Sequence, residues 1–376
     1  MDSPGLLTVT RDWGWIGITG FGGPPAHIAL LRRLCVERRG WIAAQEFEDA
    51  IAACNLLPGP ASTQLAIFCA WRVRGRLGGL VGGLAFVLPG LVAIMALSVL
   101  FLASSPPRWV LGAGAGAGAA VATVAVQAGW SLVPESRRRA RSVPRWVAYL
   151  LAGGISAATI GPWLVLVLVG CGLVELAVSS PGEGRLLGIG PLPVAAAVGG
   201  MPALAWVALK VGALSYGGGF VIVPLMQADA VNRYHWLTSG QFLNAVALGQ
   251  VTPGPVVHTV AAVGYGAHGL SGGLLAALVA FTPSFAFVLL GAGGFQRLRD
   301  SDRAQAFLAG AGPAAAGAIL GTAVPLVRAL SETWQYAVLA GAAVLLLVLR
   351  RGVVPTLLVA AAIGVAVALA GGSLPH

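Results

Sequence analysis

Long apolar stretches fill most of this chain, and short polar or basic segments separate them. Residues 357–370, for example, contain no polar side chain. Only 10% of the residues are charged, whereas soluble domains carry about 25%. About 20 apolar residues in a helix cross a bilayer, so the pattern predicts an all-α polytopic membrane protein. The predicted spans lie near residues 12–31, 77–103, 108–132, 146–160 and 162–178, and near 200–226, 271–294, 304–327, 335–349 and 353–371.

The chain also aligns with itself, which predicts two copies of one unit. At an offset of 195, "GFGGP" (20–24) faces "SYGGG" (215–219), and the two Pro-Gly-Pro triplets face each other. After one deleted residue the offset is 194, and Pro89 faces Pro283. We therefore expect a first repeat at 1–180, a linker at 181–195 and a second repeat at 196–376.

Basic residues are distributed oppositely in the two copies. The loop at 32–39 holds four arginines, while its counterpart holds Asp229 and a single arginine. Farther along, the bias reverses, because 297–303 is rich in arginine and its counterpart has only Arg108. Loops rich in Lys and Arg face the cytoplasm, so the pattern predicts inverted repeats, each upside down relative to the other.

Each Pro-Gly-Pro triplet interrupts an apolar stretch that could otherwise form a continuous helix. The loops flanking 41–71 are both basic, so this segment should enter and leave the membrane on the cytoplasmic side. By symmetry, 236–267 should re-enter from outside. The motifs "GFGGPP" and "SYGGGF" also interrupt the first segment of each copy. That segment could be one span or a hairpin, and a hairpin would place the N-terminus in the cytoplasm.

A helix that starts inside a membrane presents free N–H groups, which together with the helix dipole favour an anion. Polar side chains flank both breaks and could donate hydrogen bonds to an oxyanion. Alternatively, the prolines and glycines only bend packed helices. The candidate substrate-binding residues at the breaks are Asn55, Pro58, Gly59, Pro60, Ser62, Thr63, Gln64, Gln250, Thr252, Pro253, Gly254, Pro255, His258 and Thr259.

Further candidates lie near the glycine clusters. Lys210 is the sole lysine, and a charge within a span is a functional candidate, although it could instead extend to the interface. His27 could face the same cavity or be a satisfied buried histidine. These additional substrate-binding candidates are Gly22, Gly23, His27, Lys210, Tyr216, Gly217 and Gly218.

Glu48 and Asp49 lie on the first predicted re-entrant helix and are candidate proton carriers. The alternative is that they belong to a solvated face at the mouth of a cavity.

Several classes of protein are disfavoured. The four cysteines have no CxxC spacing, and we find no catalytic or nucleotide-binding motif, so we expect neither an enzyme nor a cofactor or metal. The net charge of +10 fits cytoplasmic loops at a lipid bilayer rather than nucleic-acid binding. The N-terminus does not resemble a cleavable signal peptide.

The motifs "GFGGPPAHIALLRR", "NLLPGPASTQ", "WLTSGQFLNAVALGQVTPGP" and "FTPSF" resemble the chromate ion transporter family, in its long form with two homologous domains. The resemblance implies a carrier of ten or more spans in the bacterial inner membrane. Such a carrier exports chromate, driven by the proton motive force in an antiport with protons, and confers chromate resistance. A homodimer is possible.

Two positions depart from the family pattern: a basic residue is usual where Trp15 stands, and an acidic residue where Asn244 stands. Either change could alter coupling. Sulfate has the shape and charge of chromate, so sulfate or another oxyanion is the alternative substrate. An alternative of another class, an enzyme acting on a phosphorylated lipid, would need an acid–base pair at membrane depth that the sequence lacks.

Overall fold

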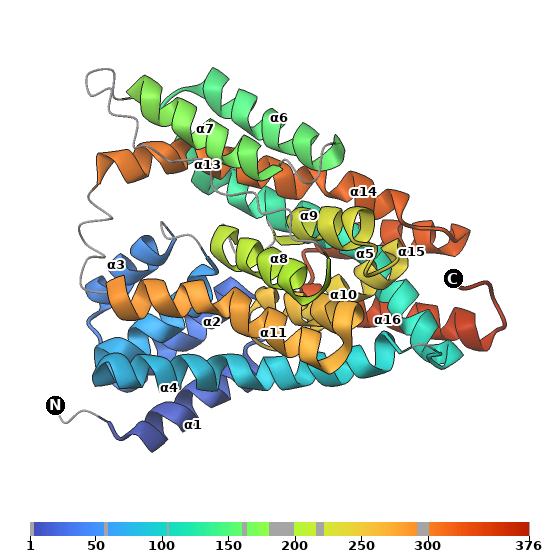
Figure 1. Ribbon diagram of the computed structural model, residues 1–376, viewed down its shortest axis with the longest axis horizontal. Helices are drawn as coiled ribbons and strands as arrows, with labels where there is room; N and C mark the ends of the chain where they lie inside the picture. Colours follow the sequence, from blue (N-terminus) through green and yellow to red (C-terminus); the bar gives the residue numbers. More distant parts are fainter. Residues whose placement is uncertain are drawn as a thin grey trace.

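The computed structural model describes residues 4–55, 59–103, 105–159, 164–179, 199–215, 222–291 and 301–375, which form helices and connecting turns without strands (Figure 1). The first half contains α1 (Leu6–Thr19), α2 (Pro24–Arg32), η1 (Arg33–Arg38), α3 (Ala44–Cys54), α4 (Ala61–Phe101), α5 (Arg108–Arg138), α6 (Val143–Thr159) and α7 (Leu164–Ser179). The second half contains α8 (Gly200–Leu214), α9 (Ile222–Gln227), η3 (Ala228–Arg233), α10 (Ser239–Val251), η4 (Val256–His258), α11 (Thr259–Gly291), α13 (Asp302–Gly321), α14 (Ala323–Arg328), α15 (Thr333–Ala343), η6 (Val344–Val348) and α16 (Val353–Leu369).

Among the described residues, four helical segments are long and apolar enough to cross a membrane: Ala61–Phe101, Arg108–Arg138, Val256–Gly291 and Asp302–Arg328. Shorter apolar helices, among them α7, α8 and α16, accompany them. Large apolar side chains such as Leu88, Leu278 and Leu358 are exposed on the outside, as expected for surfaces that face lipid. The prediction of an all-α polytopic membrane protein is therefore confirmed.

The two longest helices each turn back near their beginning. In α4 the helical geometry fails at Arg74 and Gly75, where Gly75 has a φ of +67°. Gly82 consequently packs against Ala70, although twelve residues of straight helix would separate them by about 18 Å. In α11 the same break occurs at His268 and Gly269.

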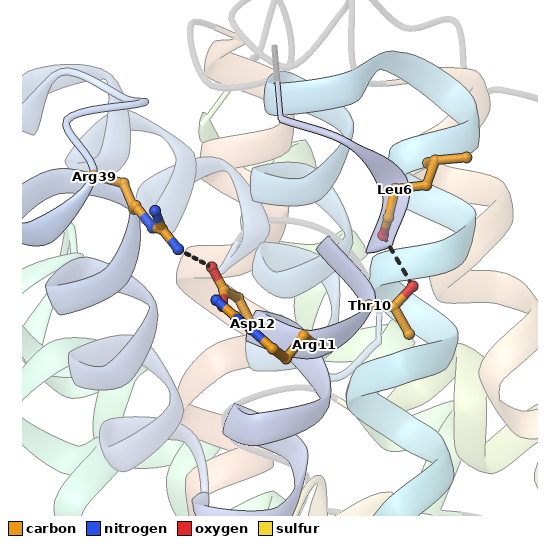
Figure 2. Close-up of polar contacts among 5 residues, drawn as sticks. All are labelled: Leu6, Thr10, Arg11, Asp12 and Arg39. Atoms are coloured by element: carbon orange, nitrogen blue, oxygen red, sulfur yellow. Dashed lines mark hydrogen bonds and ion pairs between the residues drawn. The ribbon is translucent and has the colours of Figure 1, made fainter. Parts of the chain in front are cut away.

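The first segment, predicted near 12–31, is also a hairpin rather than one continuous helix. Gly22 and Gly23 have positive φ angles of 99° and 75°, conformations that glycine adopts readily. The chain reverses there, so that Asp12 on α1 lies 3.1 Å from Arg39 beyond η1 (Figure 2). Trp13 stacks on Trp41 in the same hairpin. Of the two alternatives for this segment, the structure contains the hairpin.

The two halves are inverted copies related by reciprocal contacts. Along α4 and α11, Gly79 packs against Leu289, and Gly273 packs against Met95. Residues 79 and 273 differ by 194, as do 95 and 289, so each contact is the symmetry mate of the other. The equivalent helices therefore run antiparallel across a pseudo-twofold axis, as an inverted repeat requires.

The later helices of the two halves interlock rather than forming separate bodies. Helix α5 packs closely on α16, and α13 packs on α6 and α7 (Figure 1). Small residues allow these approaches: Gly116 lies against Ala360, and its symmetry mate Gly310 lies against Cys171. The boundaries at 180 and 196 therefore remain a prediction from the sequence repeat, and the linker at 181–195 lies outside the described residues.

Candidate functional site

The broken ends of the hairpins meet in the interior of the molecule. The backbone N–H of Gly254 donates to the carbonyl oxygen of Gly20 at 2.9 Å, which joins the second Pro-Gly-Pro turn to the first glycine cluster. In the other half, Gly59 lies beside the carbonyl of Gly212 and the hydroxyl of Ser284. Each Pro-Gly-Pro turn thus packs against the opposite half.

His27 forms polar contacts with two of these broken helix ends. Its Nε2 lies 2.9 Å from the Gly20 carbonyl oxygen, so Nε2 carries the proton and donates it. Its Nδ1 lies 3.3 Å from the Ser62 hydroxyl and is the acceptor in that pair. The ring also packs edge-on against Phe86. His27 is fully buried, and its two polar contacts fix its orientation between the first glycine cluster and the helix that follows Pro60.

His258 and Gln64 hold equivalent places in the two halves. A β-carbon on Gly59 would meet Gln64 Nε2 at 2.6 Å, and one on Gly254 would meet His258 Cε1 at 3.0 Å. Each side chain therefore folds back onto the glycine of its own turn. Residues 64 and 258 differ by 194, so the one-residue deletion falls directly after the Pro-Gly-Pro triplet.

Several buried polar atoms near these turns have no hydrogen-bond partner among the described residues. They include the hydroxyls of Thr63 and Ser284, both on fully buried side chains. The hydroxyl of Ser215 and the amide nitrogen of Gln250 belong to the same set. Buried polar groups are rarely left unpaired, because the loss of hydration is then uncompensated. The arrangement is suited to receiving a polar occupant.

Backbone donors add to this group. The backbone amides of Thr63 and Gln64 donate hydrogen bonds to the Pro60 carbonyl oxygen. The amides of Ala61 and Ser62, which precede them, therefore point beyond the start of the helix. In the second half, the His258 amide bonds to the Pro255 carbonyl.

The hydroxyls of two predicted donors already donate hydrogen bonds to backbone carbonyl oxygens. The hydroxyl of Thr252 donates to Leu248 O at 2.9 Å, and that of Thr259 donates to Val256 O at 2.7 Å. As placed, both can only accept. Four predicted site residues, Pro58, Tyr216, Gly217 and Gly218, lie outside the described residues.

The acidic candidates lie away from the turns. Glu48 forms an ion pair with Arg32, and both side chains are exposed. Asp49 accepts a hydrogen bond from Gln45 on the same helix at 3.2 Å. The neighbouring Glu46 pairs with Arg72 at the open end of the hairpin. The assignment of Glu48 and Asp49 as proton carriers stays a prediction from the sequence.

Lys210 forms an ion pair with Asp229, whose side chain is only 1% exposed. The corresponding positions in the first half are Trp15 and Leu34, offset by 195 in both cases. In the first half both members of the ion pair are therefore replaced by uncharged residues. No buried carboxylate among the described residues is left without a partner beside Trp15.

A cavity of about 600 Å³ reaches this region from the surface. Its lining includes Gly22 and Asn55 together with three arginines, Arg139, Arg350 and Arg351. The sequence did not predict that these arginines, or Gln127 and Ser131 on α5, line a cavity. Polar positions spaced along one face of that apolar helix were the available signal.

Asn244, the second departure from the family pattern, lies elsewhere. It packs against Gly114 of α5 and lines a separate cavity of about 330 Å³ with Thr238, Gln241 and Gln335. Its counterpart in the first half, offset by 195, is Asp49.

Comparison with known proteins agrees with this architecture. The family model described as "Chromate transporter" matches residues 7–176 and 202–368, one region in each half. The chain belongs to the chromate transporter family. The two matched regions of this family fit the two repeats, and the family is one of transporters rather than enzymes.

Individual relatives of the family span most of the chain. The chromate transport protein of Cupriavidus metallidurans is 32% identical over 324 residues, covering 83% of this chain and 80% of the relative. The probable chromate transport protein of Synechococcus elongatus is 32% identical over 336 residues, covering 86% and 85%. The chromate transport protein of Pseudomonas aeruginosa is 30% identical over 341 residues, covering 84% and 80%. No solved structure matches this member of the chromate transporter family.

Proposed function

We propose that this protein is a secondary transporter that exports chromate across the bacterial inner membrane, driven by the proton motive force. The observation that carries the proposal is the group of unpartnered, buried polar side chains at the broken helix ends, including Thr63 and Ser284. The names of the relatives described above support chromate as the oxyanion.

The chemistry of the turns favours an anion over a cation. Imidazole and hydroxyl groups can donate hydrogen bonds, and the adjoining helix starts add backbone N–H groups and the positive end of a dipole. The carboxylates of the described residues that form ion pairs, such as Asp12, Glu46 and Asp229, have arginine or lysine partners outside the turns. A tetrahedral dianion between the turns would thus exchange part of its hydration for these donors.

Export is the direction that the membrane potential favours for an anion. Moving one elementary charge across 100 mV changes the free energy by roughly 2.3 kcal/mol, and a dianion carries two. With the cell interior negative, this contribution drives chromate outward. A proton antiported inward would add to it.

Purified protein in liposomes tests the proposal. We expect chromate flux without chemical turnover of the substrate, and a greater flux when a pH gradient is imposed. Sulfate is measured in parallel, because a site made of hydrogen-bond donors does not readily separate two tetrahedral dianions. Flux of neither oxyanion would refute the proposal, and sulfate flux without chromate flux would reassign the substrate.

A further inference from the structure

The cavity of about 600 Å³ has a helical lining that leads inward from the surface. Its residues on α5 recur every three or four positions, so they occupy one face of the helix. From the innermost to the outermost of them, 15 residues rise by about 22 Å. The α5 residues in the lining are Val124, Gln127, Ala128, Ser131, Leu132, Glu135, Ser136 and Arg139.

The lining also includes two residues of the broken hairpins. Gly22 belongs to the first glycine cluster, and Asn55 caps α3 directly before the Pro-Gly-Pro turn. Gln127 and Ser131 offer polar side chains to the same cavity. An anion that follows α5 inward would arrive beside the group of unpartnered donors.

The described lining carries an excess of positive charge. Glu135 is the one carboxylate among the described lining residues, and Arg139 pairs with it at 2.8 Å. Arg350 and Arg351 also line the cavity and are exposed, and no carboxylate among the described residues lies within ion-pair distance of them. Two guanidinium groups therefore remain to attract anions.

The backbone at Arg350 supports a role for its side chain. Arg350 has a φ of +52°, a left-handed conformation that glycine adopts without strain and arginine does not. The turn after η1 uses Gly40, with a φ of +60°, and its counterpart after η3 uses His235, with a φ of +52°. The strain at Arg350 is consistent with a side chain that is retained for its charge.

We propose that Arg350 and Arg351 form a capture site for a tetrahedral oxyanion in this cavity. Gly22 and Asn55 of the same lining connect the capture site with the broken hairpins. Planar guanidinium groups bind tetrahedral oxyanions through paired, charge-assisted hydrogen bonds. This inference rests on the proposed function, which it deepens by naming the access route.

Thiol labelling tests the capture site without requiring transport. A Ser131→Cys variant places a reactive thiol within the cavity, while the four native cysteines are buried. We expect a thiosulfonate reagent bearing a sulfonate to react faster than one bearing a quaternary ammonium group. Adding Arg350→Gln and Arg351→Gln should lower this ratio of rates by about tenfold. Sulfate should slow labelling only when the arginines are present, and sulfate is used because chromate oxidises thiols.

The control is Arg76→Gln, which removes an exposed arginine of another basic loop that is absent from the cavity lining. It should leave the ratio unchanged. An unchanged ratio in the double variant, or a thiol at position 131 that neither reagent reaches, would overturn the inference.

Transport kinetics provide the second measurement. For Arg350→Gln with Arg351→Gln, we expect the KM for oxyanion offered at the cavity side to rise by about tenfold, with an unchanged maximal rate. From the opposite side the maximal rate should fall by about tenfold at an unchanged KM, because the ratio of Vmax/KM in the two directions is fixed by thermodynamics. A KM that rises equally on both sides would overturn the capture site while leaving the proposed function intact. A wild-type protein that transports no oxyanion, yet shows the charge-dependent labelling, would refute the function alone.

Discussion

Gly59 and Gly254 hold backbone conformations that a side chain would strain. Their φ angles are +118° and +90°, and a β-carbon on Gly59 would also lie 2.6 Å from Gln64 Nε2 and 3.2 Å from Ser284 Oγ. We expect Gly59→Ala and Gly254→Ala to insert into the membrane yet lose oxyanion flux in liposomes. Gly170→Ala is the control, because a β-carbon there meets nothing within 4 Å. Normal flux in both turn variants would place the binding site away from the turns.

His258 offers a second test at the scale of one residue. Leucine in its place would remove both ring nitrogens from a fully buried position beside Gly254. Losing a charge-assisted hydrogen bond should weaken the apparent affinity for chromate by about ten- to a hundredfold. His258→Gln should retain most of the affinity, because Gln64 occupies the equivalent place. His268→Gln changes a histidine at the break in α11 and should have little effect on the apparent affinity. Equal affinities of the leucine and glutamine variants would argue against a donor role.

At the scale of elements, the ion pair between α8 and η3 is expected to stabilise the second hairpin. Lys210→Gln would leave the buried Asp229 carboxylate with Arg233 alone, whose nearest nitrogen is 4.0 Å away. Removing one member of a buried pair costs about 3 kcal/mol of the free energy of unfolding. We therefore expect a lower thermal midpoint in detergent for this variant.

The double variant Lys210→Trp with Asp229→Leu copies Trp15 and Leu34 of the first hairpin and should recover most of the lost stability. No recovery would mean that Lys210 acts by itself, as a charge that contributes directly to transport. The sequence singled out Lys210 for its charge within a span, and the buried ion pair supplies a structural reason for that charge.

At the scale of the whole molecule, the inverted arrangement predicts opposite exposure of the matching turns η1 and η3. We expect Arg38→Cys to react with an impermeant maleimide only from the cytoplasm, and Asn232→Cys only from outside. Both positions are exposed, and the native cysteines are buried. Labelling of both positions from one side would contradict the orientation assigned from the basic loops.

The sequence predicted this architecture because the inversion gives matching loops of the two halves opposite contents of basic residues. The repeated Pro-Gly-Pro and glycine motifs gave the register, and the arginines gave the relative orientation. The pairing of Lys210 with Asp229 could not be predicted in the same way, since it depends on how one hairpin folds back. Nor could the cavity, because Arg139 and Arg350 in its lining come from opposite halves of the chain, which the interlocked helices join. A local sequence pattern predicts the helix to which a residue belongs, whereas these contacts depend on tertiary packing.

The reciprocal contacts of α4 and α11 have a consequence for energetics. If the two halves were identical, turning the molecule over would convert an inward-open conformation into an outward-open one of equal free energy, apart from asymmetry in the membrane itself. Any intrinsic preference between these conformations must therefore come from positions where the halves differ. In the interior, such positions include Gly90 opposite Ser284 and Gln64 opposite His258. A chain built from two copies of either half would populate both conformations equally, so the differences between the halves set the resting state of the natural protein.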